Sequence, residues 1–117
     1  MNIEALREYC LQKRGVSESF PFDSETLVFK VLDKAFLLTS LNNPSQINLK
    51  CDPERAVELR EQYPAIIPGY HMNKKHWNSV LFDGSLSEKF ITELIDHSYE
   101  LVIKGMPRKQ QALLQSL

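Results

Sequence analysis

The densest group of side chains able to do chemistry lies in the segment 68–77. Two adjacent lysines, Lys74 and Lys75, stand there among phenol, imidazole, amide and indole groups, which belong to Tyr70, His71, Asn73, His76 and Trp77. Lysine ammonium groups neutralise phosphates, asparagine both donates and accepts hydrogen bonds, and aromatic rings stack on nucleic-acid bases. The segment therefore predicts a phosphate-binding surface with an aromatic ring beside it.

Three more lysines fall on the strands expected below or in the turn between two of them: Lys30, Lys34 and Lys50. Most carboxylates instead fall on the expected helices, namely Glu54, Glu58, Glu61, Glu88, Glu93, Asp96 and Glu100. If the sheet carries the lysines and the helices carry the carboxylates, the net charge of −1 conceals one basic face. In the opposing interpretation the lysines are merely solvated and Trp77 belongs to the core.

A metal site would have to use His71, His76 and Cys51. The five-residue separation of the histidines does not match the close helical pair of zinc proteases, and no carboxylate stands beside them. We therefore expect no metal. Cys51 precedes a helix whose N-terminus favours a thiolate, so a Cys–His nucleophile would follow if either histidine lay close. A small buried thiol is the competing interpretation for both Cys51 and Cys10.

The common catalytic motifs are missing from the sequence. It contains no GxGxxG, P-loop, GxSxG or HExxH pattern. With only four glycines it also lacks a glycine-rich loop to cradle a phosphate. We therefore expect no catalytic residues, no enzymatic activity and no cofactor.

Length and composition limit the fold to one domain. A chain of 117 residues with 43% hydrophobic and 25% charged side chains is typical of a single globular unit, here residues 1–117. Two cysteines are too few for a disulfide framework, and no secretory signal or apolar run of about 20 residues occurs. We expect a cytoplasmic monomer with reduced thiols and no membrane partner.

Helices must hold one side of this domain. Apolar residues at helical spacing predict helices at about 2–12 and 53–62, a third helix between a capping box at Ser85–Glu88 and Gly105, and a short amphipathic tail at 111–117. Asn2 and Asp52 are the expected N-caps, and Gly15 suits the C-terminal cap of the first helix.

Strands must present the lysines. Alternating apolar and polar residues predict strands at 26–32 and 35–41, joined by a turn at Asp33-Lys34, and two more at 46–50 and 77–82. The order helix, three strands, helix, strand, helix predicts an α+β two-layer sandwich. We expect an antiparallel sheet covered on one face by the N- and C-terminal helices, with its other face partly solvated.

Over nearly its whole length the chain resembles the MmcQ/YjbR family of small bacterial proteins. The resemblance is carried by Phe20-Pro21-Phe22, Asn48-Leu49-Lys50-Cys51-Asp52-Pro53-Glu54 and the segment Pro68–Trp77. One departure is Lys13-Arg14-Gly15, where Lys-Pro-Gly is usual. The resemblance implies a CyaY-like (frataxin-like) fold and a DNA-binding function that rests on likeness of fold. The first helix offers only Glu4 and Glu8 as acids, so we expect no iron delivery.

The leading hypothesis is a non-enzymatic protein that binds DNA through its phosphates. The residues expected at this surface are Lys30, Lys50, His71, Asn73, Lys74, Lys75, His76 and Trp77. The rival hypothesis is a small-ligand or protein-interaction module in which His71–Trp77 lines a pocket. The places of Trp77 and His76 distinguish them: a ring enclosed in an apolar pocket favours the rival, and a ring beside lysines on a flat or convex face favours DNA.

Overall fold

The structure, a computed structural model, describes residues 1–69 and 72–117. Six described strands form one antiparallel sheet in the order β1-β2-β3-β4-β6-β5, and they are β1 (Val16–Ser19), β2 (Thr26–Val31), β3 (Lys34–Ser40), β4 (Gln46–Lys50), β5 (Ile66–Pro68) and β6 (Trp77–Leu81). The helices are α1 (Ile3–Leu11), α2 (Pro53–Gln62), α3 (Glu88–Lys104) and α4 (Arg108–Gln115). The expected α+β class is confirmed. Within the described ranges, no helix has the length and apolar character needed to cross a membrane.

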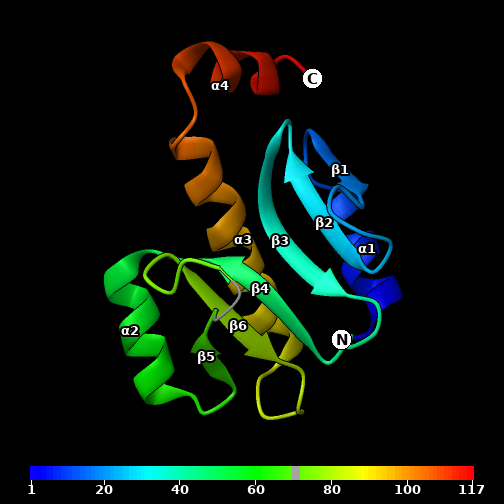
Figure 1. Cartoon of the computed structure of the whole chain (residues 1–117). Helices are drawn as coiled ribbons and strands as arrows, with labels where there is room; N and C mark the ends of the chain where they lie inside the picture. The colour runs from blue at the N-terminus through cyan, green and yellow to red at the C-terminus, as the bar shows by residue number, and fades with distance from the viewer. Residues whose placement is uncertain (70–71) are drawn as a thin grey trace.

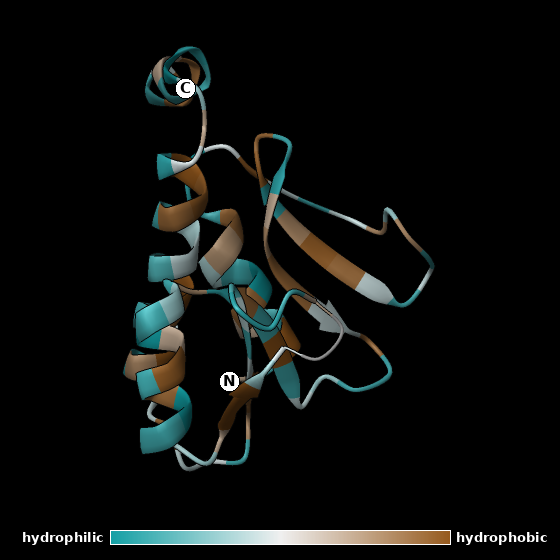
Figure 2. Ribbon diagram, turned by 60° about the vertical axis from the view of Figure 1, so that its left-hand side comes forward, coloured by the Kyte–Doolittle hydropathy of each residue, from teal (hydrophilic) through white to brown (hydrophobic). Residues whose placement is uncertain are grey.

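Helices α1, α2 and α3 lie on one face of the sheet, and no described helix covers the other face (Figure 1). Helix α3 packs on β2, β3 and β4, whereas α1 contacts β1 and α2 contacts β5. Both layers contribute to one core, which includes Leu6 of α1, Phe29 of β2, Leu59 of α2 and Ile95 of α3. Figure 2 shows apolar residues in brown alternating with polar residues in teal along α3, as expected when one side of a helix faces a core.

The first two helices begin where their capping residues predict. The side chain of Asn2 accepts a hydrogen bond of 2.8 Å from the backbone N–H of Ala5. The carboxylate of Asp52 accepts one of 3.2 Å from the backbone N–H of Arg55. Each cap satisfies a donor that the first helical turn leaves without a backbone partner.

Helix α3 starts differently from the expectation. The predicted capping box at Ser85–Glu88 does not form. The N-cap is Ser87, whose hydroxyl accepts a hydrogen bond from the backbone N–H of Phe90. In the preceding turn, the Asp83 carboxylate accepts hydrogen bonds from the backbone N–H of Ser85 at 2.9 Å and from its hydroxyl at 2.6 Å. Ser85 is therefore used by the turn and has no part in the helix.

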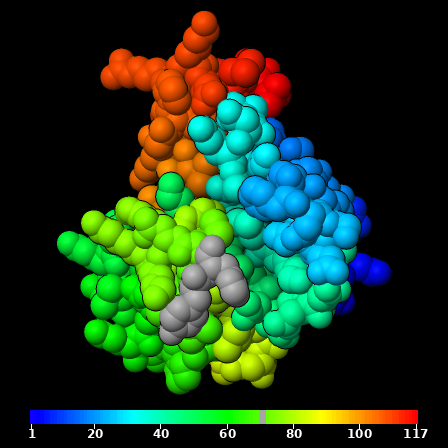
Figure 3. Space-filling model, viewed as in Figure 1, coloured from blue at the N-terminus to red at the C-terminus, as the bar shows by residue number. Residues whose placement is uncertain are grey.

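The turn between β2 and β3 is built on Leu32 and Asp33, one residue earlier than expected. Leu32 has a φ of 55°, a conformation that two-residue hairpin turns require. Its side chain lies with Leu114 of α4 over Gly15, whose own φ is 73°. Gly15 is not the cap of α1, which is Gln12; a Cβ at Gly15 would come within 2.4 Å of Leu114. Figure 3 shows α4 (red) against this hairpin tip (cyan).

Two strands, β1 and β5, lie outside the expected set, and α4 begins before the tail expected at 111–117. Strand β1 reads Val-Ser-Glu-Ser and β5 reads Ile-Ile-Pro, so each is too short to show an alternating apolar pattern. Both are the edge strands of the sheet, where short polar or proline-containing strands are tolerated. Helix α4 begins at Arg108 and is fixed by the buried side chain of Leu114.

Candidate functional site

The face of the sheet that carries no described helix presents its side chains in rows, because directly paired residues of antiparallel strands point to the same side. One continuous row crosses all six strands as Ser19, Val28, Leu38, Asn48, Ser79 and Ile67. Lys30 and Lys50 lie two residues beyond this row on β2 and β4, which run in the same direction. Trp77 is directly opposite Lys50. The register therefore brings Lys30, Lys50 and Trp77 to one end of one face.

Lys30 and Lys50 lack a carboxylate partner among the described residues. Both side chains are half-buried, and none of the described strand residues that point to this face is an aspartate or glutamate. The other face differs, since Glu18 of β1 pairs with Arg7 of α1 there. Lysines are rarely buried without a counter-charge. An anion bound at this face would supply the charge that the protein does not.

A serine of α3 holds the strand that carries Lys50. The regular pairs between β3 and β4 are Leu37 with Leu49 and Leu38 with Asn48. Beyond them, Ser98 Oγ accepts from the backbone N–H of Lys50 at 2.9 Å and donates to the carbonyl of Phe36 at 2.6 Å. Ser98 is fully buried. Its hydroxyl therefore stands in for a ladder hydrogen bond and joins the covered layer to the end of the sheet with the two lysines.

The turn before β6 is shaped by Asn73. Its backbone carbonyl accepts from the N–H groups of His76 and Trp77, and its Oδ1 accepts from the backbone N–H of Lys75 at 2.9 Å. The His76 carbonyl then accepts from Cys51 N–H at 2.8 Å and extends the pairing of β4 with β6. The Oδ1 of Asn73 is thus committed to the turn.

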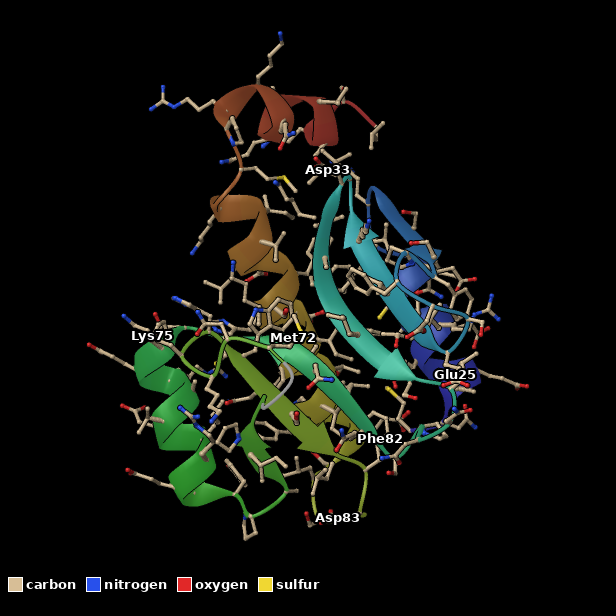
Figure 4. The ribbon with its side chains drawn as sticks, in the orientation of Figure 1. Glu25, Asp33, Met72, Lys75, Phe82 and Asp83 are labelled. Carbon is tan, nitrogen blue, oxygen red and sulfur yellow. The ribbon has the colours of Figure 1, made fainter. Side chains whose placement is uncertain are left out.

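Lys74 and Lys75 lie beside α2. The Lys74 carbonyl accepts from Arg60 of α2 at 3.4 Å. Lys75 lines a surface groove with Glu54 and Glu58, and Figure 4 shows it next to the first turn of α2, whereas Met72 is labelled in front of β4. The two lysines therefore border acidic side chains. His71, and Tyr70 before it, lie outside the described residues.

Positive and negative side chains are separated less completely between the sheet and the helices than the sequence predicts. The helices also carry cations, namely Arg7 on α1, Arg55 and Arg60 on α2, Lys89 and Lys104 on α3, and Arg108 and Lys109 on α4. Both signs therefore mix on the helical side. Among the described strands, Lys30 and Lys50 share one face, whereas Lys34 of β3 is opposite Val31 and lies on the other.

Cys51 is buried at the start of α2. Burial raises the pKa of its thiol to about 11, although Arg55 opposes the shift, so the thiol stays protonated at neutral pH. This outcome overturns the expectation that the start of α2 favours a thiolate. Burial likewise raises the pKa of Cys10 to about 12. No three His, Cys, Asp or Glu side chains of the described chain are grouped to hold a metal ion.

A small cavity of about 10 Å³ lies behind β4 and β6, and one of its lining residues is a histidine that the sequence analysis missed. His97 of α3 lines it with Cys51 and Asn78, and its Nε2 accepts from the backbone N–H of Asp52 at 3.2 Å. Burial and the charge of Arg55 lower the pKa of His97. Its position three residues after the core residue Leu94 was the available signal, because that spacing faces the same layer.

Comparison with known proteins places these residues in a family. The YjbR family model matches residues 11–101. Protein YjbR of Escherichia coli K12 is 36% identical over the full length of both chains. Protein YbdF of E. coli O157:H7 is 40% identical over 92% of this chain and 89% of its own, and YyaQ of Bacillus subtilis is 37% identical over 84% and 95%. All three are described as uncharacterised.

Solved structures show the same fold. The crystal structure of Deinococcus radiodurans protein DR2400, with a DUF419 domain, superposes with a TM-score of 0.89 and 43% identity, over 97% of this chain and 88% of that one. A crystal structure of a protein from Pseudomonas syringae superposes with a TM-score of 0.75 and 32% identity, over 87% and 99%. The sheet and its helices are therefore shared across these proteins.

Proposed function

This chain belongs to the YjbR family, and we propose that it is a non-enzymatic DNA-binding protein. Its binding surface is the face of the sheet opposite α1, α2 and α3. One observation carries the proposal: Lys30 and Lys50 share an end of this face, next to Trp77, and no carboxylate of the described strands neutralises them. Cations held in this way favour a polyanion.

The residues of the site have different roles in this proposal. Lys30 and Lys50 contact phosphates directly, and Trp77 packs against a sugar or base. Lys74, Lys75 and His76 extend the surface toward α2, where Glu54 and Glu58 weaken the attraction. Asn73 keeps the turn in shape through its bond to the Lys75 N–H.

The position of Trp77 favours DNA over the rival module. Its side chain is half-buried and stands opposite Lys50 in the ladder between β4 and β6. A recognition pocket for a small apolar ligand would enclose an aromatic ring among other apolar side chains. The lysine beside Trp77 is better suited to a phosphate.

Salt dependence tests the proposal. With about four to six phosphate contacts, the logarithm of the affinity falls by about 0.9 per contact for each tenfold rise in salt. A labelled DNA duplex titrated by fluorescence anisotropy at about 50 and 200 mM salt measures this slope. Binding that weakens steeply supports the proposal. Tight binding that ignores salt rejects it, and so does the absence of binding at the lower salt by both this duplex and a labelled single strand.

We further propose that the protein is a cytoplasmic monomer without a membrane partner or a cofactor, and that its fold is related to that of frataxins. An antiparallel sheet with its helices on one face is the arrangement that a CyaY-like fold requires, and it supports that relationship. Superposition on a frataxin structure tests the relationship of the folds, and sedimentation of the purified chain tests whether it is a monomer.

A further inference from the structure

Trp77 and Lys50 are close enough for one nucleotide to contact both. Directly opposed residues in an antiparallel ladder have Cβ atoms about 5 Å apart and point to the same side. A nucleotide likewise combines a flat ring with a nearby negative charge. Lys30 lies two strands away from Lys50, about 10 Å in a regular sheet. It can therefore meet a different phosphate of the same strand.

The neighbouring row adds a polar contact beside this pair. Ser79 donates a hydrogen bond of 2.6 Å to Asn48 Oδ1. The amide nitrogen of Asn48 has no acceptor among the described residues, although it holds two donor hydrogens. Val28 and Leu38 complete the row as a buried apolar floor. Because both are closed to solvent, a base lying on this face would find the Trp77 ring and the Asn48 amide donor but no open apolar surface.

A duplex does not match this surface well. Its bases are stacked and paired, so their flat faces are closed to Trp77, and its major groove is entered by a helix or a two-stranded ribbon. Helices α1, α2 and α3 lie on the opposite face. The β2–β3 hairpin is not a free ribbon either, because β1 and β4 pair with its strands, α4 packs on its tip, and the tip carries the carboxylate of Asp33 (Figure 4). In single strands, by contrast, bases turn outward and stack on aromatic side chains.

We propose that this face prefers single-stranded nucleic acid over duplex DNA, with a base stacked on Trp77 and successive phosphates on Lys50 and Lys30. This inference rests on the proposed function and narrows its ligand. DNA and RNA single strands share the chemistry that the site recognises, and the experiment compares them.

Trp77 is the single tryptophan of the chain, so its fluorescence reports on this site alone. The test titrates the full chain at low salt with a short oligothymidylate, an oligouridylate of equal length and a duplex. We expect either single strand to quench the fluorescence and to bind about tenfold more tightly than the duplex, since stacking of one base contributes about 1–3 kcal/mol. The tighter of the two single strands identifies the preferred sugar.

Two variants separate stacking from folding. Trp77→Leu removes the ring, and we expect it to weaken single-strand binding about tenfold, measured by anisotropy of a labelled strand, while duplex binding changes little. Trp77→Phe keeps a ring and restores most of the affinity. If the duplex binds as tightly as the single strands, or if Trp77→Leu binds them normally, the inference is wrong but DNA binding stands. If neither form binds at low salt, the proposed function itself fails.

Discussion

Ser98 Oγ lies 2.9 Å from the backbone nitrogen of Lys50 and accepts its hydrogen bond. The serine belongs to the buried side of α3, whereas the lysine side chain points to the opposite face of the sheet. The same hydroxyl donates to the Phe36 carbonyl, so one side chain closes the gap between β3 and β4. The core and the proposed binding surface are therefore coupled through a single hydroxyl.

Replacing Ser98 by alanine should destabilise the protein by about 2–4 kcal/mol. The change leaves two buried backbone groups, the Lys50 N–H and the Phe36 carbonyl, without a partner, and each costs about 1–3 kcal/mol. Urea unfolding measures the loss. Ser17→Ala is the matched control, because this exposed strand serine should change stability by less than about 0.5 kcal/mol. Equal stability of the two variants would show that the bridge is not structural.

Both cysteines should be unreactive in the folded protein. Burial raises the pKa of Cys51 to about 11 and that of Cys10 to about 12, so few thiolates exist at neutral pH. We expect an alkylating reagent to modify neither thiol while the chain is folded and both once it is denatured. Rapid modification of Cys51 in the native protein would revive the nucleophile hypothesis.

The free energy of unfolding should decrease as the pH falls below the pKa of a free histidine side chain, because His97 resists protonation when the protein is folded. Burial and then Arg55 lower its pKa from 6.5, whereas Asp52 and Glu100 act in the opposite direction. The unfolded chain binds the proton more readily, so stability is fully present above pH 6.5 and is lost as the pH falls from 6.5 toward the lower folded value. Urea unfolding at a series of pH values measures this.

The His97→Gln variant should lack this pH dependence, since glutamine does not titrate. Losses caused by carboxylates remain and appear in more acidic solution, because the pKa values of Glu18 and Asp83 are lowered by their hydrogen bonds to Arg7 and Ser85. A wild-type protein as stable at pH 5.5 as at pH 7, to within about 0.3 kcal/mol, would contradict the prediction for His97.

Lys13 and Asp96 should be energetically coupled across α1 and α3. The ammonium of Lys13 lies 2.5 Å from Asp96 Oδ1 and 5.0 Å from the ring centres of Tyr9 and Tyr99. The Tyr9 hydroxyl donates to the same carboxylate at 2.6 Å. A double-mutant cycle with Lys13→Met and Asp96→Asn should give a coupling free energy of about 1 kcal/mol. Strict additivity of the two substitutions would contradict it.

Local signals in the sequence predict the long elements of the fold well. Asn2 and Asp52 mark the starts of α1 and α2, because a short polar side chain satisfies the free N–H groups there. Strands β1 and β5 are held by their neighbours in the sheet rather than by a pattern of their own. Helix α4 is positioned by distant contacts, such as Leu114 over Gly15 and Arg14 with the Gln115 carbonyl, which no local pattern predicts.

The candidate site is predicted only in part, for a similar reason. Residue types suggest phosphate binding, but the common face of Lys30 and Lys50 depends on strand register, including the irregularity between Phe29 and Lys30 in the pairing with β3. Conversely, residues that are close in the sequence lie at different places in the structure. Trp77 lies opposite Lys50 on the sheet, whereas Lys75 lies beside α2. The role of Ser98 needs the contact of a helix with two strands, which spacing alone does not reveal.

Charge reversal at the sheet face tests the central claim most directly. The double variant Lys30→Glu/Lys50→Glu should abolish DNA binding at low salt, measured by anisotropy with a labelled strand. Lys89→Glu/Lys109→Glu changes the net charge equally on exposed positions of α3 and α4, and it should bind as the wild type does. Loss of binding in the sheet variant alone is the predicted result. Equal effects of the two variants would contradict a binding site on this face.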